Sequence, residues 1–290
     1  MTLTQALHAA QAHGLDRLDA QLLLLHALGR PMHDRAWLLA HDGDTLPATA
    51  QAAFDAAVQR RAAGEPVAYL TGHKEFFGLD LQVDRRVLVP RPDTETLVEW
   101  ALASLPPPLG EAWPVPSLSR EGGGTPPRVI DLGTGSGAIA LALKHSRPDL
   151  EVTAVDASAD ALAVARANAR RLKLEVDFQA GCWLSQVTGR FDLIVSNPPY
   201  IAAHDRHLDA LRHEPLQALA SGADGLDDLR QIIAQARAHL LPGGWLLLEH
   251  GWDQAAAVRG LLAEAGLAEV QSRPDLSGIE RCSGGRKPPG

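Results

Sequence analysis

The stretch VIDLGTGSGAIALAL, residues 129–143, decides the fold that this sequence predicts. Its apolar start ends at Asp131, the glycines Gly133, Gly135 and Gly137 follow closely, and the remaining residues have helical spacing. Glycine tolerates positive φ and lets a ligand approach the backbone without a Cβ in the way. The pattern predicts a strand, a tight turn and a helix, with the turn at the carboxyl end of the strand, where open α/β sheets bind ligands.

A second acidic residue supports a nucleoside site at this turn. The glycine spacing is not the G-x-G-x-x-G of dinucleotide sites, since the third glycine comes one residue early, which leaves less reason to expect a pyrophosphate. The next strand, EVTAVD, ends in Asp156, which would lie beside the turn and accept hydrogen bonds from ribose hydroxyls. The turn alone is a weak signal, because a glycine connection that binds nothing looks the same.

Apolar strands and amphipathic helices alternate along the rest of the chain. Further strands are expected in EVDFQAGCW, FDLIVSNPPY and WLLLEHG, and helices in ASADALAVARANARRL and near residues 227–239. This order predicts an α/β fold with a largely parallel sheet that helices cover on both faces.

Composition divides the chain into successive parts. The first residues are rich in Ala, Leu and Gln at helical spacing, the next segment has short apolar runs between glycines, and a Pro- and Gly-rich stretch then prevents regular structure. We predict a helical domain at 1–75, a β-hairpin connector at 76–104, a linker insertion at 105–127, the α/β domain at 128–285 and a tail at 286–290.

Charge and cysteine content exclude several classes of protein. The 290 residues carry a formal net charge of -8, which disfavours binding of duplex nucleic acid through its phosphates. The two cysteines, Cys182 and Cys282, match no paired spacing, so we expect neither a disulfide framework nor a structural metal. Without a basic leader or an apolar run of membrane-spanning length, the sequence predicts a cytoplasmic protein that is not exported.

The segment FDLIVSNPPYI, residues 191–201, predicts an apolar strand that ends in an unusual group of residues. Two prolines, Pro198 and Pro199, remove two backbone donors and leave carbonyls that only accept hydrogen bonds. With the side-chain oxygen of Asn197 and the carbonyl of Pro198 aimed at one point, both hydrogens of a planar NH2 group would be bound and a carbonyl oxygen would be rejected. Tyr200 offers a flat face on which a planar group would stack.

Such a site suits transfer of a group to a nitrogen. The nitrogen of an amide or exocyclic amine is a poor nucleophile, because its lone pair is delocalised. Fixing both N–H bonds favours positive charge on that nitrogen and aims its lone pair at an electrophile. If the nucleoside pocket holds S-adenosylmethionine, its sulfonium methyl is the matching electrophile. The alternative is a proline turn that merely closes a strand.

These motifs, in this order, resemble those of the release factor glutamine methyltransferases. The resemblance rests on VIDLGTGSGAIALAL, AVDASADALAVARANA, FDLIVSNPPYI, EPLQAL and LPGGWLLLEHG, and on the upstream connector GEPVAYLTGHKEFFGLDLQVDRRVLVPRPDTE. It covers nearly the whole chain. It implies a Rossmann-like S-adenosylmethionine-dependent methyltransferase domain and an N-terminal domain that helps to hold the protein substrate. It also implies methyl transfer to the side-chain amide nitrogen (N5) of the glutamine in the Gly-Gly-Gln motif of class I peptide chain release factors.

The resemblance also implies roles for individual residues. Asp156 would hold the ribose of the cofactor, Trp183 would lie near the adenine, and the methionine part would be lined by Gly133, Thr134, Gly135, Ser136 and Gly137. The glutamine amide would be held by Asn197, Pro198, Pro199 and Tyr200, with Asn197, Pro198 and Tyr200 catalytic and Asn197 also beside the cofactor. Glu214 matches a family position with a structural role. Cys182 stands where relatives often have Asp, so an acidic contact near the adenine is missing.

Other readings of the sequence remain. The same chemistry would act on a glutamine of a ribosomal protein or on an adenine amino group, although the acidic charge weighs against adenine. The alternative of another class is a noncatalytic adaptor that binds the cofactor. The acceptors around Asn197 disfavour it, because an adaptor has no need of them. The histidines His204, His207 and His213 match no ligand spacing, so we expect no metal there and a polar loop instead. His250 is expected to be a hydrogen-bonded structural residue.

Overall fold

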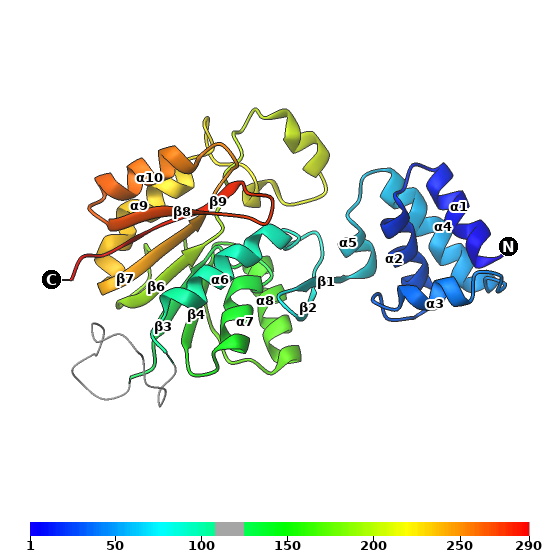
Figure 1. The fold of residues 1–290 in the computed structure, drawn as a ribbon, viewed down its shortest axis with the longest axis horizontal. Coiled ribbons are helices and arrows are strands. Elements are labelled where there is room, and N and C mark those ends of the chain that lie inside the picture. The colour runs from blue at the N-terminus through cyan, green and yellow to red at the C-terminus, as the bar shows by residue number, and fades with distance from the viewer. Residues whose placement is uncertain (108–124, 290) are drawn as a thin grey trace. The chain divides into compact units, whose positions relative to one another are not determined.

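The computed structural model describes residues 1–107 and 125–289 and divides the chain into two compact units, Met1–His73 and Lys74–Gly290 (Figure 1). The predicted linker at 105–127 lies mostly outside the described residues. Within them, no helix combines the length and the apolar composition that crossing a membrane requires.

The first unit is helical, as predicted. It consists of α1 (Leu3–Ala12), α2 (Arg17–Ala27), α3 (Arg35–Ala40), α4 (Ala48–Ala62) and α5 (Val67–Thr71). Local sequence fixes where helices begin, because Thr2 and Gln5 form a reciprocal capping box at α1 and Asp16 caps α2. The leucines of α2 pack with Leu3 and Phe54 into the core of this unit. A helical face buried against its neighbours supplies most of the stability of such short helices.

The second unit is built on a seven-stranded sheet with strand order β5-β4-β3-β6-β7-β9-β8. Its strands are β3 (Arg128–Leu132), β4 (Glu151–Asp156), β5 (Asp177–Ala180), β6 (Phe191–Ser196), β7 (Leu240–Glu249), β8 (Ala268–Pro274) and β9 (Glu280–Arg286). The five strands from β3 to β7 are parallel, and β9 is antiparallel to both of its neighbours. The prediction of an α/β fold with a mainly parallel sheet is confirmed.

Helices cover both faces of this sheet. Figure 1 shows α6 (Glu95–Ser104), α7 (Ala138–Ser146) and α8 (Ala159–Leu172) on one face and α9 (Asp227–His239) and α10 (Ala255–Glu264) on the other. A separate two-stranded sheet, β1 (His73–Phe76) and β2 (Leu79–Gln82), forms the hairpin expected in the connector. Three short 3-10 helices complete the described elements: η1 (Pro92–Thr94), η2 (Arg206–Leu211) and η3 (Leu216–Ala218).

The C-terminal hairpin of β8 and β9 corrects the predicted tail. Arg286 is the last residue of β9, and the backbone of Lys287 both donates to Gly244 and accepts from Gly243. The glycines in this strand serve packing: a Cβ at Gly284 would lie 2.5 Å from a side-chain carbon of Leu247, so only glycine lets β9 approach β7. Arg286 is therefore part of the sheet, and Lys287 is hydrogen-bonded to it.

The register of the parallel strands brings four residues to one edge of the sheet. Leu132 of β3 pairs with Val155 of β4 and with Ser196 of β6, and Ser196 pairs with Leu248 of β7. The next residue of each strand is therefore level with the others: Gly133, Asp156, Asn197 and Glu249. In open parallel sheets, ligands bind at this carboxyl edge.

Candidate active site

A cavity of about 510 Å³ lies at the carboxyl edge of the sheet. Six of the residues predicted from the sequence line it: Gly133, Gly135, Asp156, Trp183, Asn197 and Pro199. Other predicted residues do not line the cavity: Thr134, Ser136, Gly137, Pro198 and Tyr200. Residues predicted from three different strand ends thus line one cavity, whereas several of their neighbours in sequence lie outside its lining.

The glycine turn is shaped by positive backbone angles. Gly133, Gly135 and Gly137 have φ of 71°, 56° and 86°. A Cβ at Gly135 would meet nothing within 4 Å, so the space beside this residue is open to a ligand. A Cβ at Gly137 would instead press on Leu141 at 3.0 Å, so this glycine serves helix packing.

Two residues of the turn have inward-facing partners. The hydroxyl of Thr134 donates to Asp131 over 2.7 Å, and the carbonyl of Ser136 accepts from the side-chain amide of Asn168. Both side chains are buried. They stabilise the turn from inside.

Asp156 is a carboxylate held in one orientation. One of its oxygens accepts from the backbone N–H of Ser158 over 2.8 Å, and the other accepts from Gly135 over 2.9 Å. Burial raises the pKa of Asp156, and these two hydrogen bonds oppose the shift. Each oxygen keeps a free lone pair, so the carboxylate can accept two further hydrogen bonds at the cavity wall.

Asp131 carries a buried oxygen without a partner. One oxygen accepts from Thr134 and from the backbone of Ala140, whereas Oδ1 has no hydrogen bond among the described residues. Burial raises the pKa of Asp131 to about 7. Oδ1 is therefore a buried acceptor whose hydrogen-bonding capacity is unused among the described residues.

Trp183 closes the cavity beside the glycine turn. Its backbone has a positive φ of 50°, and its ring lies where a Cβ at Gly133 would meet it at 3.1 Å. The indole N–H donates to Asp228 over 3.2 Å. Asp228 lines the same cavity, and the sequence analysis missed it, although two adjacent acids at the start of a predicted helix were a visible signal.

The replacement of Asp by Cys182 was expected to remove an acidic contact near the adenine, and Asp228 supplies a different acid in the same cavity. Cys182 lines the cavity as well, so the substituted position does face the predicted ligand. The acid that lines the wall here comes from the first turn of α9 and not from the segment next to Trp183.

Asn197 is oriented by its own hydrogen bond. Its amide nitrogen donates over 3.1 Å to the hydroxyl of Thr94, which is a buried residue of η1. Since Asn197 also lines the cavity, the amide oxygen is the atom that remains to face a ligand. Thr94 was not predicted from the sequence, since no motif marks it.

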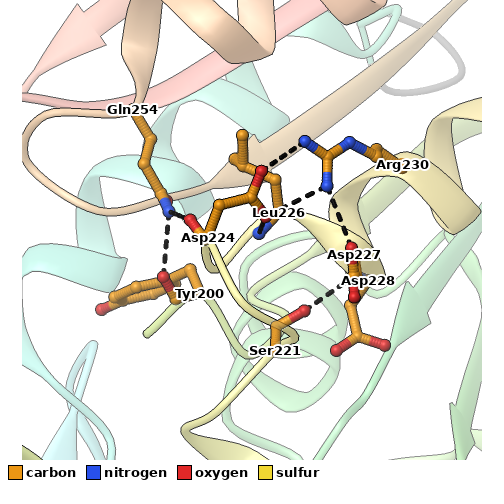
Figure 2. A network of polar contacts seen from close by, with 8 residues as sticks. All are labelled: Tyr200, Ser221, Asp224, Leu226, Asp227, Asp228, Arg230 and Gln254. Atoms are coloured by element: carbon orange, nitrogen blue, oxygen red, sulfur yellow. Dashed lines mark hydrogen bonds and ion pairs between the residues drawn. The ribbon is translucent and has the colours of Figure 1, made fainter. Parts of the chain in front are cut away.

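The segment after Asn197 is anchored from behind. Figure 2 shows the side-chain nitrogen of Gln254 donating to the carbonyl of Tyr200 over 3.0 Å and to that of Asp224 over 3.4 Å. The same figure shows Arg230 paired with Asp224 and Asp227 at the start of α9. These contacts fix the backbone that carries the predicted acceptor group.

The phenol of Tyr200 stays neutral in this environment. Burial raises its pKa, and the nearby carboxylate of Glu249 raises it further. Tyr200 therefore cannot serve as a base at neutral pH.

Glu214 ties two loops of the cavity wall together. Its carboxylate, which is 2% exposed, accepts from the backbone of Val89 and from the guanidinium of Arg91. Residues on both sides of this link line the cavity, with Leu88 before Val89 and Pro215 after Glu214. A structural role was implied for Glu214, and this geometry provides one.

Two of the histidines discussed from the sequence, His207 and His250, have side-chain partners. His207 pairs with Asp205 at the exposed start of η2. His250 is buried, and its two ring nitrogens contact the carbonyl of Gly251 and the hydroxyl of Ser283. In residues 1–107 and 125–289, no group of three or more His, Cys, Asp or Glu side chains lies close enough to hold a metal ion.

The side chains of the cavity fit S-adenosylmethionine. That cofactor carries a sulfonium and an ammonium, and the wall offers the fixed carboxylate of Asp156 and the carboxylate of Asp228. The basic residue in the lining, Arg86, is already bound to Asp84 through two hydrogen bonds. The open space at Gly135 leaves room for a ligand against the backbone.

Both units match known family models. Residues 117–222 match the Methyltransferase small domain, and residues 2–72 match the PrmC N-terminal domain.

Several curated proteins align along almost the whole chain, and all of the following are named release factor glutamine methyltransferase. The protein from Xylella fastidiosa is 50% identical over 287 residues, which cover 98% of this chain and 98% of that protein. The protein from Bordetella pertussis is 51% identical over 276 residues, covering 94% and 95%. The protein from Escherichia coli is 43% identical over 288 residues, covering 98% and 97%.

Solved structures share the fold at low identity. A methyltransferase from Pyrococcus furiosus has a TM-score of 0.53 at 20% identity, covering 79% of this chain and 97% of its own. A 16S rRNA methyltransferase from T. thermophilus, in complex with AdoMet and guanosine, has a TM-score of 0.50 at 20% identity, covering 74% and 49%.

The sheet, the glycine turn and the acid-lined cavity, together with the matched methyltransferase domain, define an S-adenosylmethionine-dependent methyltransferase. The family within this class follows from the relatives above, to which the chain is 43–51% identical over almost its whole length. The chain belongs to the release factor glutamine methyltransferase family.

Proposed function

We propose that this enzyme methylates the side-chain amide nitrogen (N5) of the glutamine in the Gly-Gly-Gln motif of class I peptide chain release factors. One observation carries the proposal: the amide nitrogen of Asn197 donates inward to Thr94, which leaves the amide oxygen to face the cavity. An oxygen acceptor at a strand end, beside a cofactor site, suits a substrate that presents an NH2 group. The names of the relatives support a release factor as the protein that carries this glutamine.

The proposed cofactor site is the acidic part of the cavity. Asp156 would bind the ribose hydroxyls through its two free lone pairs, and Trp183 would lie against the adenine. The methionine part would lie along the turn from Gly133 to Gly137, above the unpaired oxygen of Asp131. When bound, S-adenosylmethionine supplies an electrophilic methyl group on a positively charged sulfur.

The substrate amide would be held by two oxygens. The side chain of Asn197 and the backbone carbonyl of Pro198 would each accept one N–H of the glutamine, with Pro199 completing the wall. Holding both hydrogens turns the nitrogen lone pair outward from the acceptors and stabilises positive charge on the nitrogen. A carbonyl oxygen placed in the same position would face two acceptors, so the amide is bound in only one orientation.

Tyr200 would contribute shape and rigidity to the reaction. Its phenol remains protonated because of burial, so the proton that the nitrogen loses would leave to water and not to this residue. The hydrogen bond from Gln254 to its carbonyl keeps the acceptor segment in place. Positioning of the glutamine amide and electrostatic stabilisation of its nitrogen would supply most of the rate enhancement of methyl transfer.

The helical unit would bind the body of the release factor, and its match to a domain model of its own supports a separate role for it. We further propose that the enzyme works in the cytoplasm, where release factors act in translation termination. We propose no direct binding of DNA and no association with a membrane.

The function is tested by methyl transfer from a labelled cofactor to purified substrates. We expect label on a wild-type release factor and none on a variant in which the glutamine of the Gly-Gly-Gln motif is alanine. Asn197→Ala should abolish labelling while the enzyme still binds the cofactor, as measured by calorimetry. Equal labelling of the glutamine-free release factor would overturn the target. Labelling of a ribosomal protein or of adenine in its place would support those alternatives, and cofactor binding without any transfer would support an adaptor.

A further inference from the structure

Glu249 is a buried acid directly beside the proposed substrate acceptor. It is the last residue of β7, and only 2% of its surface is exposed. The pairing of Ser196 with Leu248 places Glu249 level with Asn197 on the neighbouring strand. The reaction described above does not use this side chain.

The polar surroundings of Glu249 point to Asn197. The side chains of Thr94 and Asn197 both form hydrogen-bonding interactions with its carboxylate, and the amide nitrogen of Asn197 also donates to the hydroxyl of Thr94. The second carboxylate oxygen, Oε2, has no partner in the described part of the chain. Asn197 and the buried residues Thr94 and Glu249 therefore form one cluster, with more acceptors than donors.

This excess of acceptors decides how the amide of Asn197 is turned. An ionised carboxylate only accepts hydrogen bonds, whereas a side-chain amide has a donating and an accepting end. The donating end must therefore face Glu249 and Thr94, and the oxygen must face the cavity. A carboxylate that accepts from the nitrogen also polarises the amide and makes its oxygen a stronger acceptor.

We propose that Glu249, acting through Asn197 and together with Thr94, is a positioning residue that fixes the acceptor oxygen toward the substrate nitrogen. The inference rests on the proposed function. Burying a lone carboxylate is costly, and a neutral glutamine of the same shape would avoid that cost. A carboxylate at this position agrees with a role in orienting the Asn197 amide. Glutamine cannot fill that role, because its side chain both donates and accepts hydrogen bonds.

The charge of Glu249 depends on pH in the physiological range. The pKa of Glu249 is raised to about 7, mainly by burial and also by the neighbouring Asp93. The contacts from Thr94 and Asn197 and the charge of Arg281 oppose this shift. Of the other groups that face it, Tyr200 and Cys282 stay neutral because burial raises the pKa of each. Below pH 7 the protonated acid can itself donate to the oxygen of Asn197, which would turn the amide the wrong way.

The first test compares Glu249→Gln with the wild-type enzyme at saturating cofactor and release factor. We expect kcat to fall roughly 10- to 100-fold, the scale seen when an outer partner of a functional side chain is lost, with KM and cofactor affinity changed less than about twofold. The wild-type kcat should rise with pH through about 7, and this rise should be absent in the variant. Glu264→Gln, at the end of α10, is the matched surface control and should change nothing.

A second pair of variants separates positioning from folding. Thr94→Val removes the hydroxyl that accepts from Asn197, whereas Thr94→Ser keeps it, so activity should fall in the first and be retained in the second. Amide NMR gives a readout without turnover: the side-chain NH2 signal of Asn197, identified by its loss in Asn197→Ala, should shift with pH in the wild type and not in Glu249→Gln.

The possible results are distinct. A wild-type kcat and pH profile in Glu249→Gln, or an Asn197 signal that titrates without Glu249, would overturn the positioning role while leaving the proposed function intact. If the wild-type enzyme does not methylate a release factor at all, the proposed function fails first, and the NMR titration still decides whether Glu249 orients Asn197.

Discussion

The carbonyl oxygen of Tyr200 lies against Gly225, so close that a Cβ at position 225 would be 2.2 Å from it. Gly225 also has a positive φ of 77° and would press on the side chain of Gln254, which donates to the same carbonyl. The backbone behind the substrate site is thus held between Gly225, which has no side chain, and Gln254, the residue that precedes α10. This contact explains why the segment from Asn197 to Tyr200 can be rigid although it lies outside any helix or strand.

Gly225→Ala should therefore damage the site as well as the fold. The added methyl must displace Tyr200 or Gln254, and the backbone angle is strained for alanine, so the free energy of unfolding should fall by about 1–3 kcal/mol. Methyl transfer should fall more than tenfold, because a small shift of the acceptors misplaces the substrate nitrogen. Gly278→Ala is the control, since Gly278 has a similar φ of 80° with nothing within 4 Å. Equal activity of the two variants would contradict this account.

Asp156→Asn should weaken cofactor binding. Both carboxylate oxygens accept backbone N–H groups, and an amide can offer an oxygen to only one of them. Loss of charge-assisted hydrogen bonds to ribose would add to this, so the Kd for S-adenosylmethionine should rise roughly 10- to 100-fold. Calorimetry measures the Kd directly, with Asp160→Asn on the exposed first turn of α8 as the control. An unchanged Kd would remove Asp156 from the proposed cofactor site.

Asp131 should make the stability of the unliganded protein depend on pH. Its pKa is raised from 3.8 to about 7 in the folded state by burial, so the folded protein holds this proton more tightly than the unfolded chain. The resulting stabilisation is complete below about pH 3.8 and is lost as pH rises through about 7.

Asp131→Asn removes this titration and keeps an oxygen for Thr134 and Ala140. Between pH 5 and pH 8, the stability of the wild type should fall relative to the variant by an amount on the order of a few kcal/mol. Urea unfolding at both pH values gives the difference, and the contribution of Glu249 cancels because both proteins contain it. Parallel pH curves for the two proteins would show that Asp131 does not titrate in this range.

Glu214→Ala should cost far more stability than loss of a surface acid. It would leave the buried N–H of Val89 without a partner and Arg91 without its carboxylate, so we expect a loss of about 2–4 kcal/mol. Glu151→Ala breaks the exposed pair with Arg128 and should cost less than about 1 kcal/mol. Thermal unfolding of the two variants compares them, and similar losses would mean that Glu214 does not link the two loops.

Predictions from the sequence succeeded where the information is local or periodic. Glycines after Asp131, an acid after the second strand and an amide after FDLIVS each mark a strand end, and parallel strands bring such ends to one edge of a sheet. The predicted tail at 286–290 was wrong at its first residue, because Arg286 belongs to β9. The hydrogen bond from Arg286 to the carbonyl of Gly243 joins residues 43 positions apart, so no local pattern indicates it.

The sequence by itself determined the fold class and the presence of Asn197 at the carboxyl edge of the parallel strands, because strand length and apolar periodicity are written in neighbouring residues. The tertiary structure alone decided which end of the Asn197 amide faces the cavity. Thr94 lies 103 residues before Asn197, and Asp228 lies 45 residues after Trp183. Hydrogen bonds over such separations exist only once the sheet has formed, and so the direction of an amide cannot be read from the residues beside it.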